Sequence, residues 1–186
     1  LVRSQPGKFS YSSAGIGLSQ HRAGELMNNM AGLDMMHVPN PGNPWADVLA
    51  GRTQLMFGNV AVALPFIKDG KVRGLAVTST TRAAAAPDLP TVSESGLPGF
   101  ESMSWFGVLA PAGTPPAVLQ RLEAELQKAM ATPTIQSRLA TMGAMPGVQN
   151  AAGFTRVIES EIKRWALKPA AAAPGTATGA NTAQRP

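Results

Sequence analysis

The stretch "SSAGIGLSQHRAGELM", from Ser12 to Met27, places two glycines one residue apart between a short apolar run and a helical pattern. Just before the glycines, "KFSYSS" (8–13) alternates apolar and small polar residues, which predicts a strand. After them, apolar residues recur at helical spacing as far as Gly32, a typical helix stop: Ala23, Leu26, Met27 and Met30. A glycine turn of this kind can bring backbone N–H groups at a helix start close to an anion. The stretch therefore predicts an anion-binding turn.

The elements around this turn alternate between strand and helix. Strands are expected over 33–39 ("LDMMHVP"), 53–60 ("TQLMFGNV") and 72–79 ("VRGLAVTS"). Helices are expected over 45–50, where Gly51 ends the helix, and over 61–68, with a break near Pro65. This order is typical of a parallel sheet covered by helices on both faces. The first 80 residues are thus predicted to form an α/β unit.

The remainder of the chain is predicted to be mostly helical. Residues 80–99 are rich in Ala, Pro, Ser and Gly, which indicates a surface connection with one helical turn at 92–95. A strand is expected over 103–111, followed by helices that begin at Thr114-Pro115 and Thr132-Pro133 and a third helix over 154–165. Residues 168–186 lack large apolar side chains and are predicted to be a disordered tail.

Composition excludes several classes of protein. The 186 residues carry 16 basic and 11 acidic side chains and no cysteine, which rules out disulfides and thiolate metal sites. The basic residues form no cluster interleaved with aromatic residues, so no nucleic-acid partner is expected. No stretch is apolar enough to insert in a bilayer. The chain opens on Leu1 without a signal peptide, and we expect residues upstream of it to be missing.

The glycine pair matches only part of the dinucleotide-binding fingerprint. Gln20 stands where the third glycine is required, and Asp34 begins the next strand instead of ending it. No Gly-Lys-Ser/Thr follows, so the turn is not a P-loop. A tight turn without any ligand remains the alternative interpretation. The hydroxyl groups of Ser12, Ser13 and Ser19 favour a site for a carboxylate or a phosphate instead.

Evidence for an enzyme is weak. His21 and His37 are the only histidines, neither has an acidic residue at metal-ligand spacing, and no G-x-S-x-G nucleophile elbow occurs. We expect both histidines to be structural. The predicted protein is therefore not an enzyme, and it has neither a cofactor nor a metal ion.

Taken together, the motifs resemble one family, the Bug or TctC-type substrate-binding receptors of tripartite tricarboxylate transporters. The resemblance rests on segments in the family's order, and they cover nearly all of 6–165: "PGKFSYSSAGIGLSQHRAGELM", "HVPNPG", "DVLAGRTQLMFGN", "ALPFIKDGKVRGLAVTS", "APDLPTVSESGLPGFESMSWFGVLAPAGTP" and "EIKRW". It implies an α/β fold like that of type II periplasmic binding proteins, a Venus flytrap, with one nearly complete lobe (1–103) and part of the other (104–167) followed by the tail (168–186).

The resemblance also implies a function and a site. The function is that of a periplasmic receptor, not itself inserted in the membrane, which binds a small carboxylate (a dicarboxylate, tricarboxylate, amino acid or aromatic acid) and delivers it to the membrane subunits of a tripartite transporter. The residues at matching positions are the expected ligand-binding residues: Ser12, Ser13, Gly15, Gly17, Leu18, Ser19, Gly42 and Asn59.

The cleft departs from the family pattern at several positions. Leu18 replaces a usual Ser or Thr, Ile16 a common Asn, Asn40-Pro41 the usual Tyr-Lys, and Gly58 a frequent Asp. Each change removes a polar group, at a cost of about 1 to 3 kcal/mol of binding for each lost donor. These changes suggest a truncated or degenerate receptor. The alternative is a truncated protein that does not serve transport and acts as an interaction or sensing module.

Overall fold

The computed structural model describes residues 1–145, 147 and 150–166, and the predicted tail over 168–186 lies outside them. The chain divides into two compact units, Leu1–Gly147 and Val148–Pro186. The predicted lobe boundary after Met103 stays a prediction. The first unit holds a short 3-10 helix (Val2–Ser4), the sheet and five α-helices. None of the helices in the described ranges is both long and apolar enough to cross a membrane.

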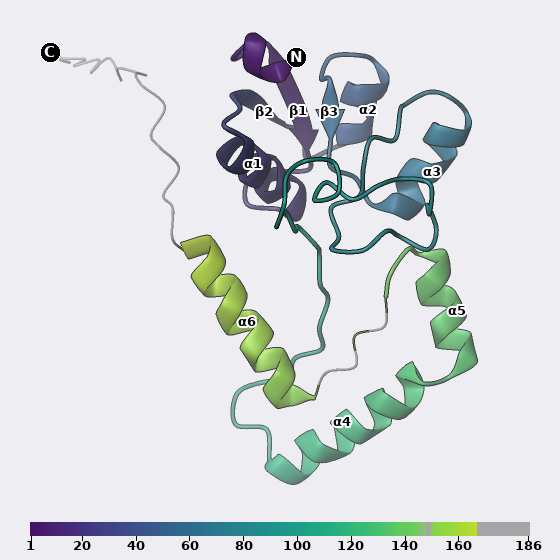
Figure 1. Ribbon diagram of the computed structural model, residues 1–186. Helices are drawn as coiled ribbons and strands as arrows, with labels where there is room; N and C mark the ends of the chain where they lie inside the picture. The colour runs from purple at the N-terminus through teal and green to yellow at the C-terminus, as the bar shows by residue number, and fades with distance from the viewer. Residues whose placement is uncertain (146, 148–149, 167–186) are drawn as a thin grey trace, which may run out of the picture. The chain divides into compact units, whose positions relative to one another are not determined.

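The sheet has three parallel strands in the order β2-β1-β3 (Figure 1). β1 (Phe9–Ser13) is central and pairs with β2 (Met35–Pro39) along its whole length and with β3 (Leu55–Met56) at Tyr11 and Ser12. Because β1 has a neighbour on each side, the residues in its second half are fully buried: Tyr11, Ser12 and Ser13. The predicted parallel α/β arrangement is confirmed, although β3 is much shorter than the expected 53–60.

Three helices follow the three strands: α1 (Ser19–Ala31), α2 (Pro44–Leu49) and α3 (Val60–Lys68). α1 is followed by Gly32, as predicted. Gly32 adopts the left-handed backbone conformation (φ 60°, ψ 47°) that commonly ends a helix. α3 continues through Pro65, so the expected break there is wrong. Pro65 is exposed, and its ring removes only the one backbone hydrogen bond that its missing N–H would make.

The segment after α3 supplies much of the core without forming the predicted strand over 72–79. Only an isolated bridge between Val77 and Thr91 forms in the described residues, and Pro90 has no N–H with which to extend the ladder. The expectation that 80–99 is a surface connection holds only in part: most of these residues are exposed or half-buried, but Ala86, Thr91 and Val92 are buried. Phe100, 1% exposed, completes this cluster.

The predicted helical turn at 92–95 does form. The N–H of Ser95 donates to the carbonyl of Thr91 (3.1 Å). A reciprocal pair of bonds caps the turn: the N–H of Glu94 donates to Thr91 Oγ1 (3.0 Å), and the N–H of Thr91 donates to Glu94 Oε2 (2.8 Å). Arg82 Nε lies 3.1 Å from the same carboxylate, and these bonds lower the pKa of Glu94.

The expected strand over 103–111 does not form. Its apolar residues Phe106, Val108 and Leu109 are 92%, 73% and 75% exposed, and no neighbouring strand is present in the described residues to pair with them. α4 (Pro116–Met130) starts after Pro115, one residue later than the predicted cap at Thr114. α5 (Pro133–Thr141) starts after Thr132 as predicted. In the second unit, α6 (Ala151–Ala166) matches the third predicted helix.

Candidate functional site

The candidate site lies at the carboxyl ends of the strands. In a parallel sheet all these ends share one edge, and here each strand leads into a helix whose N-terminus starts from that edge: β1 into α1, β2 into α2 and β3 into α3 (Figure 1). Ligands of open α/β sheets usually bind outside this edge. Every predicted ligand-binding residue lies in one of these three strand-to-helix connections or within two residues of one.

The N-termini of the three helices differ in how they are capped. Asn43 Oδ1 accepts from the N–H of Ala46 (3.3 Å) at the start of α2, and Asn59 Oδ1 accepts from the N–H of Ala61 (2.9 Å) at the start of α3. α1 follows Leu18, whose side chain cannot accept a hydrogen bond, and it has no side-chain cap. A helix start leaves its first N–H groups without intrahelical partners. Of these three N-termini, that of α1 alone lacks a side-chain cap, and it is called the open N-terminus below.

The glycine turn before α1 is held by two side chains from the first turn of that helix. The N–H of Ala14 donates to Gln20 Oε1 (2.7 Å), and the N–H of Gly17 donates to His21 Nδ1 (3.1 Å). Gly17 has a positive φ of 81°, which favours glycine at this point of the turn. Neither Gln20 nor His21 was predicted to have this role. The available signal was their position in the first turn, where side chains commonly reach back to preceding N–H groups.

The two buried serines at the end of β1 support the turn from inside. Ser12 Oγ donates to the carbonyl of Pro44 (3.0 Å) and so links β1 to the start of α2. Ser13 Oγ lies 2.6 Å from His37 Nε2 and accepts from the N–H of Gly15 (3.1 Å). Both serines are 0% exposed. Their hydroxyl groups hold neighbouring segments together, so their predicted contact with a ligand would require a change of partner.

The remaining predicted residues lie closer to solvent. Ser19 is half-buried at the first position of α1, and its hydroxyl has no hydrogen-bond partner in the part of the chain that the structure describes. Gly42 is exposed, and its N–H donates to Asn40 Oδ1 (3.2 Å) within the turn after β2. Asn59 is exposed, but its amide oxygen caps α3. Ser19 is thus the serine best placed to meet a ligand.

Behind the turn lies a compact group of rings. The His21 and His37 rings are 4.2 Å apart between centroids, and Tyr11 stacks on His37 at 5.1 Å. Burial lowers the pKa of His37, the neighbouring His21 lowers it further, and Glu25 partly opposes both effects. His21 accepts a hydrogen bond at Nδ1, which places its proton on Nε2. This assignment follows from the hydrogen-bond partner. His21 therefore supports the turn directly, and His37 supports it through Ser13.

Tyr11 connects this group to α1. Its hydroxyl donates to Glu25 Oε1 (2.8 Å), and burial, followed by that bond, raises the pKa of Tyr11 strongly. α1 approaches the tyrosine ring at Gly24, where an added Cβ would lie 2.2 Å from a ring carbon. The helix that carries the open N-terminus is thus fixed against the central strand at a position that only glycine fits.

The turn between β2 and α2 is fixed by a carboxylate. Asp47 Oδ2 accepts from Asn40 Nδ2 (2.7 Å), and Asp47 Oδ1 pairs with the guanidinium of Arg52 at 2.7 and 2.8 Å. The hydrogen bond from Asn40 and then that from Arg52 lower the pKa of Asp47. Asp47 is 7% exposed. Its charge is therefore committed within the fold and is not offered to a ligand.

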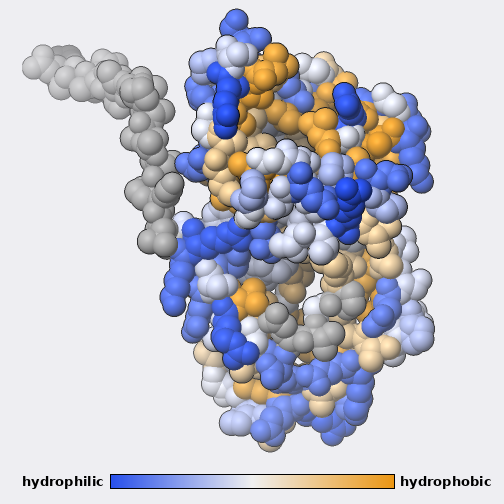
Figure 2. All heavy atoms as spheres, in the orientation of Figure 1, coloured by the Kyte–Doolittle hydropathy of each residue, from blue (hydrophilic) through white to orange (hydrophobic). Residues whose placement is uncertain are grey.

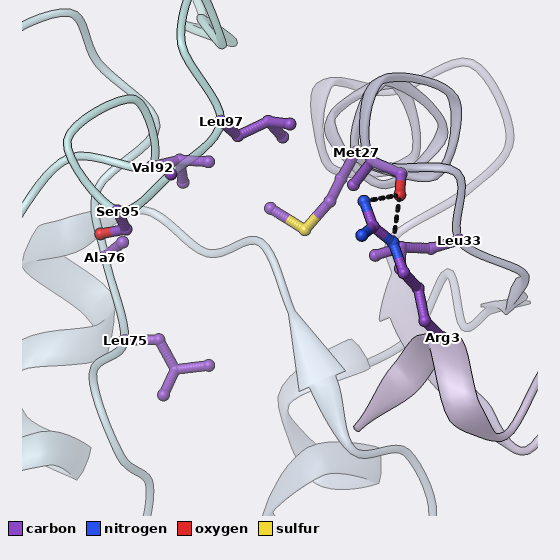
Figure 3. Close-up of a pocket in the computed structure, with 10 residues that line it drawn as sticks. Arg3, Met27, Leu33, Leu75, Ala76, Val92, Ser95 and Leu97 are labelled. Atoms are coloured by element: carbon purple, nitrogen blue, oxygen red, sulfur yellow. Dashed lines mark hydrogen bonds between the residues drawn. The ribbon is translucent and has the colours of Figure 1, made fainter.

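A hollow of about 330 Å³ lies between α1 and the segment after α3 (Figure 3). Apolar side chains such as Met27, Leu33 and Leu97 line it, and Arg3 closes one side by donating two hydrogen bonds to the carbonyl of Ala31 (2.7 and 3.0 Å). None of the predicted ligand-binding residues lines this pocket. The glycine turn and the pocket are therefore separate features.

Comparisons with known proteins identify the family and the fold of the chain. The family model described as a tripartite tricarboxylate transporter family receptor matches residues 1–168. A protein of Pseudomonas sp. strain P51, described as a UPF0065 protein in the tcbD-tcbE intergenic region, is 41% identical over 171 residues, which cover 88% of this chain and 50% of that protein. The structure of R. palustris Rpa4515 with adipate is 32% identical with a TM-score of 0.79, and the match covers 89% of this chain and 56% of that one.

MatC from Rhodopseudomonas palustris, solved with bound malate, is 28% identical with a TM-score of 0.75, and the match covers 88% of this chain and 57% of that one. The chain thus spans about half the length of these three proteins. The expected α/β fold of periplasmic binding proteins is confirmed.

Proposed function

The chain belongs to the tripartite tricarboxylate transporter receptor family, and from this premise we propose that it binds a small carboxylate at the glycine turn between β1 and α1. The family is one of solute receptors, which bind their ligand without converting it. In this proposal the protein is a receptor and not an enzyme. It works in the periplasm and delivers its solute to the membrane subunits of a tripartite transporter.

The observation that carries the proposal is the open N-terminus of α1. At the edge shared by three helix starts, α2 and α3 are capped by their own asparagines, whereas α1 is not capped by a side chain. The positive end of the helix dipole and its unbonded N–H groups favour a negative charge there, by about 0.3 to 1 kcal/mol for the dipole alone. The free hydroxyl of Ser19 adds a donor.

The ligands of similar proteins support a carboxylate over a phosphate. Two of the similar structures contain adipate and malate, both carboxylates. The described part of this chain also lacks the Lys at the turn that phosphate loops use. Of the predicted ligand-binding residues, we assign Ser19 and the backbone of Gly15, Gly17 and Leu18 to the ligand. Ser12 and Ser13 hold the turn in place.

The test is a thermal melt of the chain with and without small carboxylates. A ligand that binds only the native state raises its stability, and near saturation the midpoint should rise by about 5 °C. Gly17→Val, at φ 81°, should abolish the rise by blocking the turn. Gly70→Val, at φ 67° in the turn after α3, carries similar backbone strain and should keep the rise. An equal loss in both variants, or no rise with any carboxylate, would contradict the proposal.

A second candidate function is an interaction module, favoured by the exposed apolar side chains of residues 103–109 and of α4. Phe106 is 92% exposed, and one face of α4 exposes Val118, Leu119, Leu122 and Leu126 by 42% to 49%. Apolar patches of this kind often mark protein–protein contacts. Light scattering of the purified chain distinguishes the two: a monomer at all concentrations removes this candidate, and a defined oligomer supports it.

A further inference from the structure

The side chains of the glycine turn itself are apolar and uncovered. Ile16 is 77% exposed and Leu18 is 49% exposed. Leu18 folds back over the turn, since a Cβ placed on Gly15 would lie 3.6 Å from Leu18 Cδ1. Large apolar side chains are usually withdrawn from water. Two of them beside an open helix N-terminus give the anion site an apolar border.

A third apolar group reaches the same edge from α2. The indole of Trp45 covers Gly58, at the end of β3, so closely that a Cβ on Gly58 would lie 2.5 and 2.9 Å from two ring carbons. The ring also packs against Phe66 at 5.1 Å. Pro44, next to Trp45, accepts the hydrogen bond of Ser12, and Ser12 pairs with Met56 of β3. The segments that carry Trp45 and Gly58 are thus both hydrogen-bonded to β1, the strand that leads into the glycine turn.

Among the residues that the structure describes, the charged side chains of α1 and α2 at this edge already have partners and are not free for a second polar group on the ligand. The acidic residues of the three helices are Glu25 and Asp47, and both are occupied: Glu25 by the hydroxyl of Tyr11 and Asp47 by Asn40 and Arg52. Arg52 is likewise committed to Asp47, and Arg22 in α1 already has a partner within the chain. A ligand ammonium or a second carboxylate would have to give up water here without a partner of opposite charge, which is costly.

From these three observations we infer that the edge selects a carboxylate with an apolar body, a hydrocarbon chain or ring, over a dicarboxylate or an amino acid. The inference rests on the proposed function and names its ligand class. The carboxylate meets the N-terminus of α1 and the hydroxyl of Ser19. The body lies on Leu18, Ile16 and the aromatic surface of Trp45, where its burial contributes to affinity in proportion to the apolar area covered.

The experiment compares three six-carbon acids that differ only at the far end: hexanoate, adipate and 6-aminohexanoate. Titration calorimetry of the 186-residue chain should give hexanoate an affinity at least about tenfold higher than the other two. Adipate or 6-aminohexanoate binding as tightly as hexanoate would overturn the inference and leave the proposed function standing. Binding of none of the three, nor of acetate, would overturn both.

A matched pair of variants tests the apolar contact. Leu18 and Leu122 are both 49% exposed, the first at the turn and the second on α4. Leu18→Ala should lower hexanoate affinity roughly fivefold and lower acetate affinity less, because acetate has no body to bury. Alanine is chosen because its side chain, unlike that of serine, cannot cap the start of α1. Leu122→Ala should change neither affinity. Equal hexanoate affinity in the Leu18→Ala variant and the unchanged chain would show that the body lies elsewhere and would overturn the inference.

Discussion

Two regions of this chain show how differently sequence patterns become structure. The sheet region (residues 1–68) contains three strands and three α-helices that pack on one another, with Tyr11 fully buried at the centre. The helical arm (residues 103–145) contains α4 and α5, while its expected strand stays unpaired in the described residues and its apolar side chains stay exposed. Figure 2 colours one face of the molecule by hydropathy and shows apolar residues at the surface among polar ones.

The difference shows that a helix forms its backbone hydrogen bonds within itself, whereas a strand needs a neighbouring strand to form them. "FSYSS" forms a strand because "MMHVP" and "LM" lie on either side of it. "MSWFGVLAP" is richer in apolar residues than "FSYSS", yet it forms no strand, because no described segment pairs with it. The sheet region should therefore be sensitive to single contacts, and the helical arm should be tolerant of them.

The largest expected effect is that of Gly24→Ala in the sheet region. The new methyl would lie 2.2 to 2.8 Å from the ring of Tyr11, so the helix must shift, and we expect the free energy of unfolding to fall by about 3 kcal/mol. Helix propensity alone would favour alanine. The control is Gly42→Ala, whose methyl meets only Asn40 Oδ1 at 3.5 Å. Urea denaturation of both variants gives the comparison, and equal stabilities would show that the packing of α1 on β1 is loose.

The next effect concerns the hydrogen bond between His21 and the glycine turn. His21→Leu removes the acceptor for the N–H of Gly17, and carboxylate affinity should fall roughly tenfold because a hydrogen bond to the turn is lost. His21→Asn keeps an acceptor near the position of Nδ1 and should recover most of the affinity. Hydrogen exchange of the Gly17 amide should accelerate in the leucine variant only. If the two variants bind alike, His21 does not position the turn.

Folding stability should also depend on pH, through His37 in the sheet region. Because the pKa of His37 is lowered from 6.5 in the folded chain, the unfolded chain binds this proton more readily. The contribution of His37 to the free energy of unfolding is therefore fully present above about pH 6.5, and it decreases as the pH falls below that value. The carboxylates with lowered pKa, Asp47 and Glu94, titrate only below their ordinary values of 3.8 and 4.5.

Thermal melts between pH 7 and 5 measure this effect for the unchanged chain and for His37→Gln, which has no group that titrates in this range. The midpoint should fall on acidification in the unchanged chain and fall less in the variant. Identical pH profiles would remove His37 as the cause.

The smallest effect is expected in the helical arm. Leu122→Ala removes a side chain that is 49% exposed and replaces it with a good helix former, so the free energy of unfolding should change by less than about 0.5 kcal/mol. The same urea denaturation measures it. A loss comparable to that of Gly24→Ala would show that α4 is packed as tightly as the sheet region and would break the comparison.

Local patterns were sufficient to predict most elements of the sheet region. The spacing after Gly17 predicted α1, and Gly32 predicted its end. The partners of the site residues were not predictable, because they lie far apart in sequence: Ser13 bonds to His37, and Ser12 to Pro44. The strand expected over 72–79 failed for a similar reason, since its periodicity says nothing of the proline opposite it.

The most direct test of the carboxylate site is the change in backbone amide resonances when hexanoate is added to the ¹⁵N-labelled chain. We predict that the largest shifts fall on the amides of Gly15 to Gln20, at the turn and the open start of α1, while those of α2 and α3 behind their asparagine caps move less. Saturable shifts confined to residues outside the three strand-to-helix connections, or no shifts at all, would contradict a carboxylate site at the glycine turn.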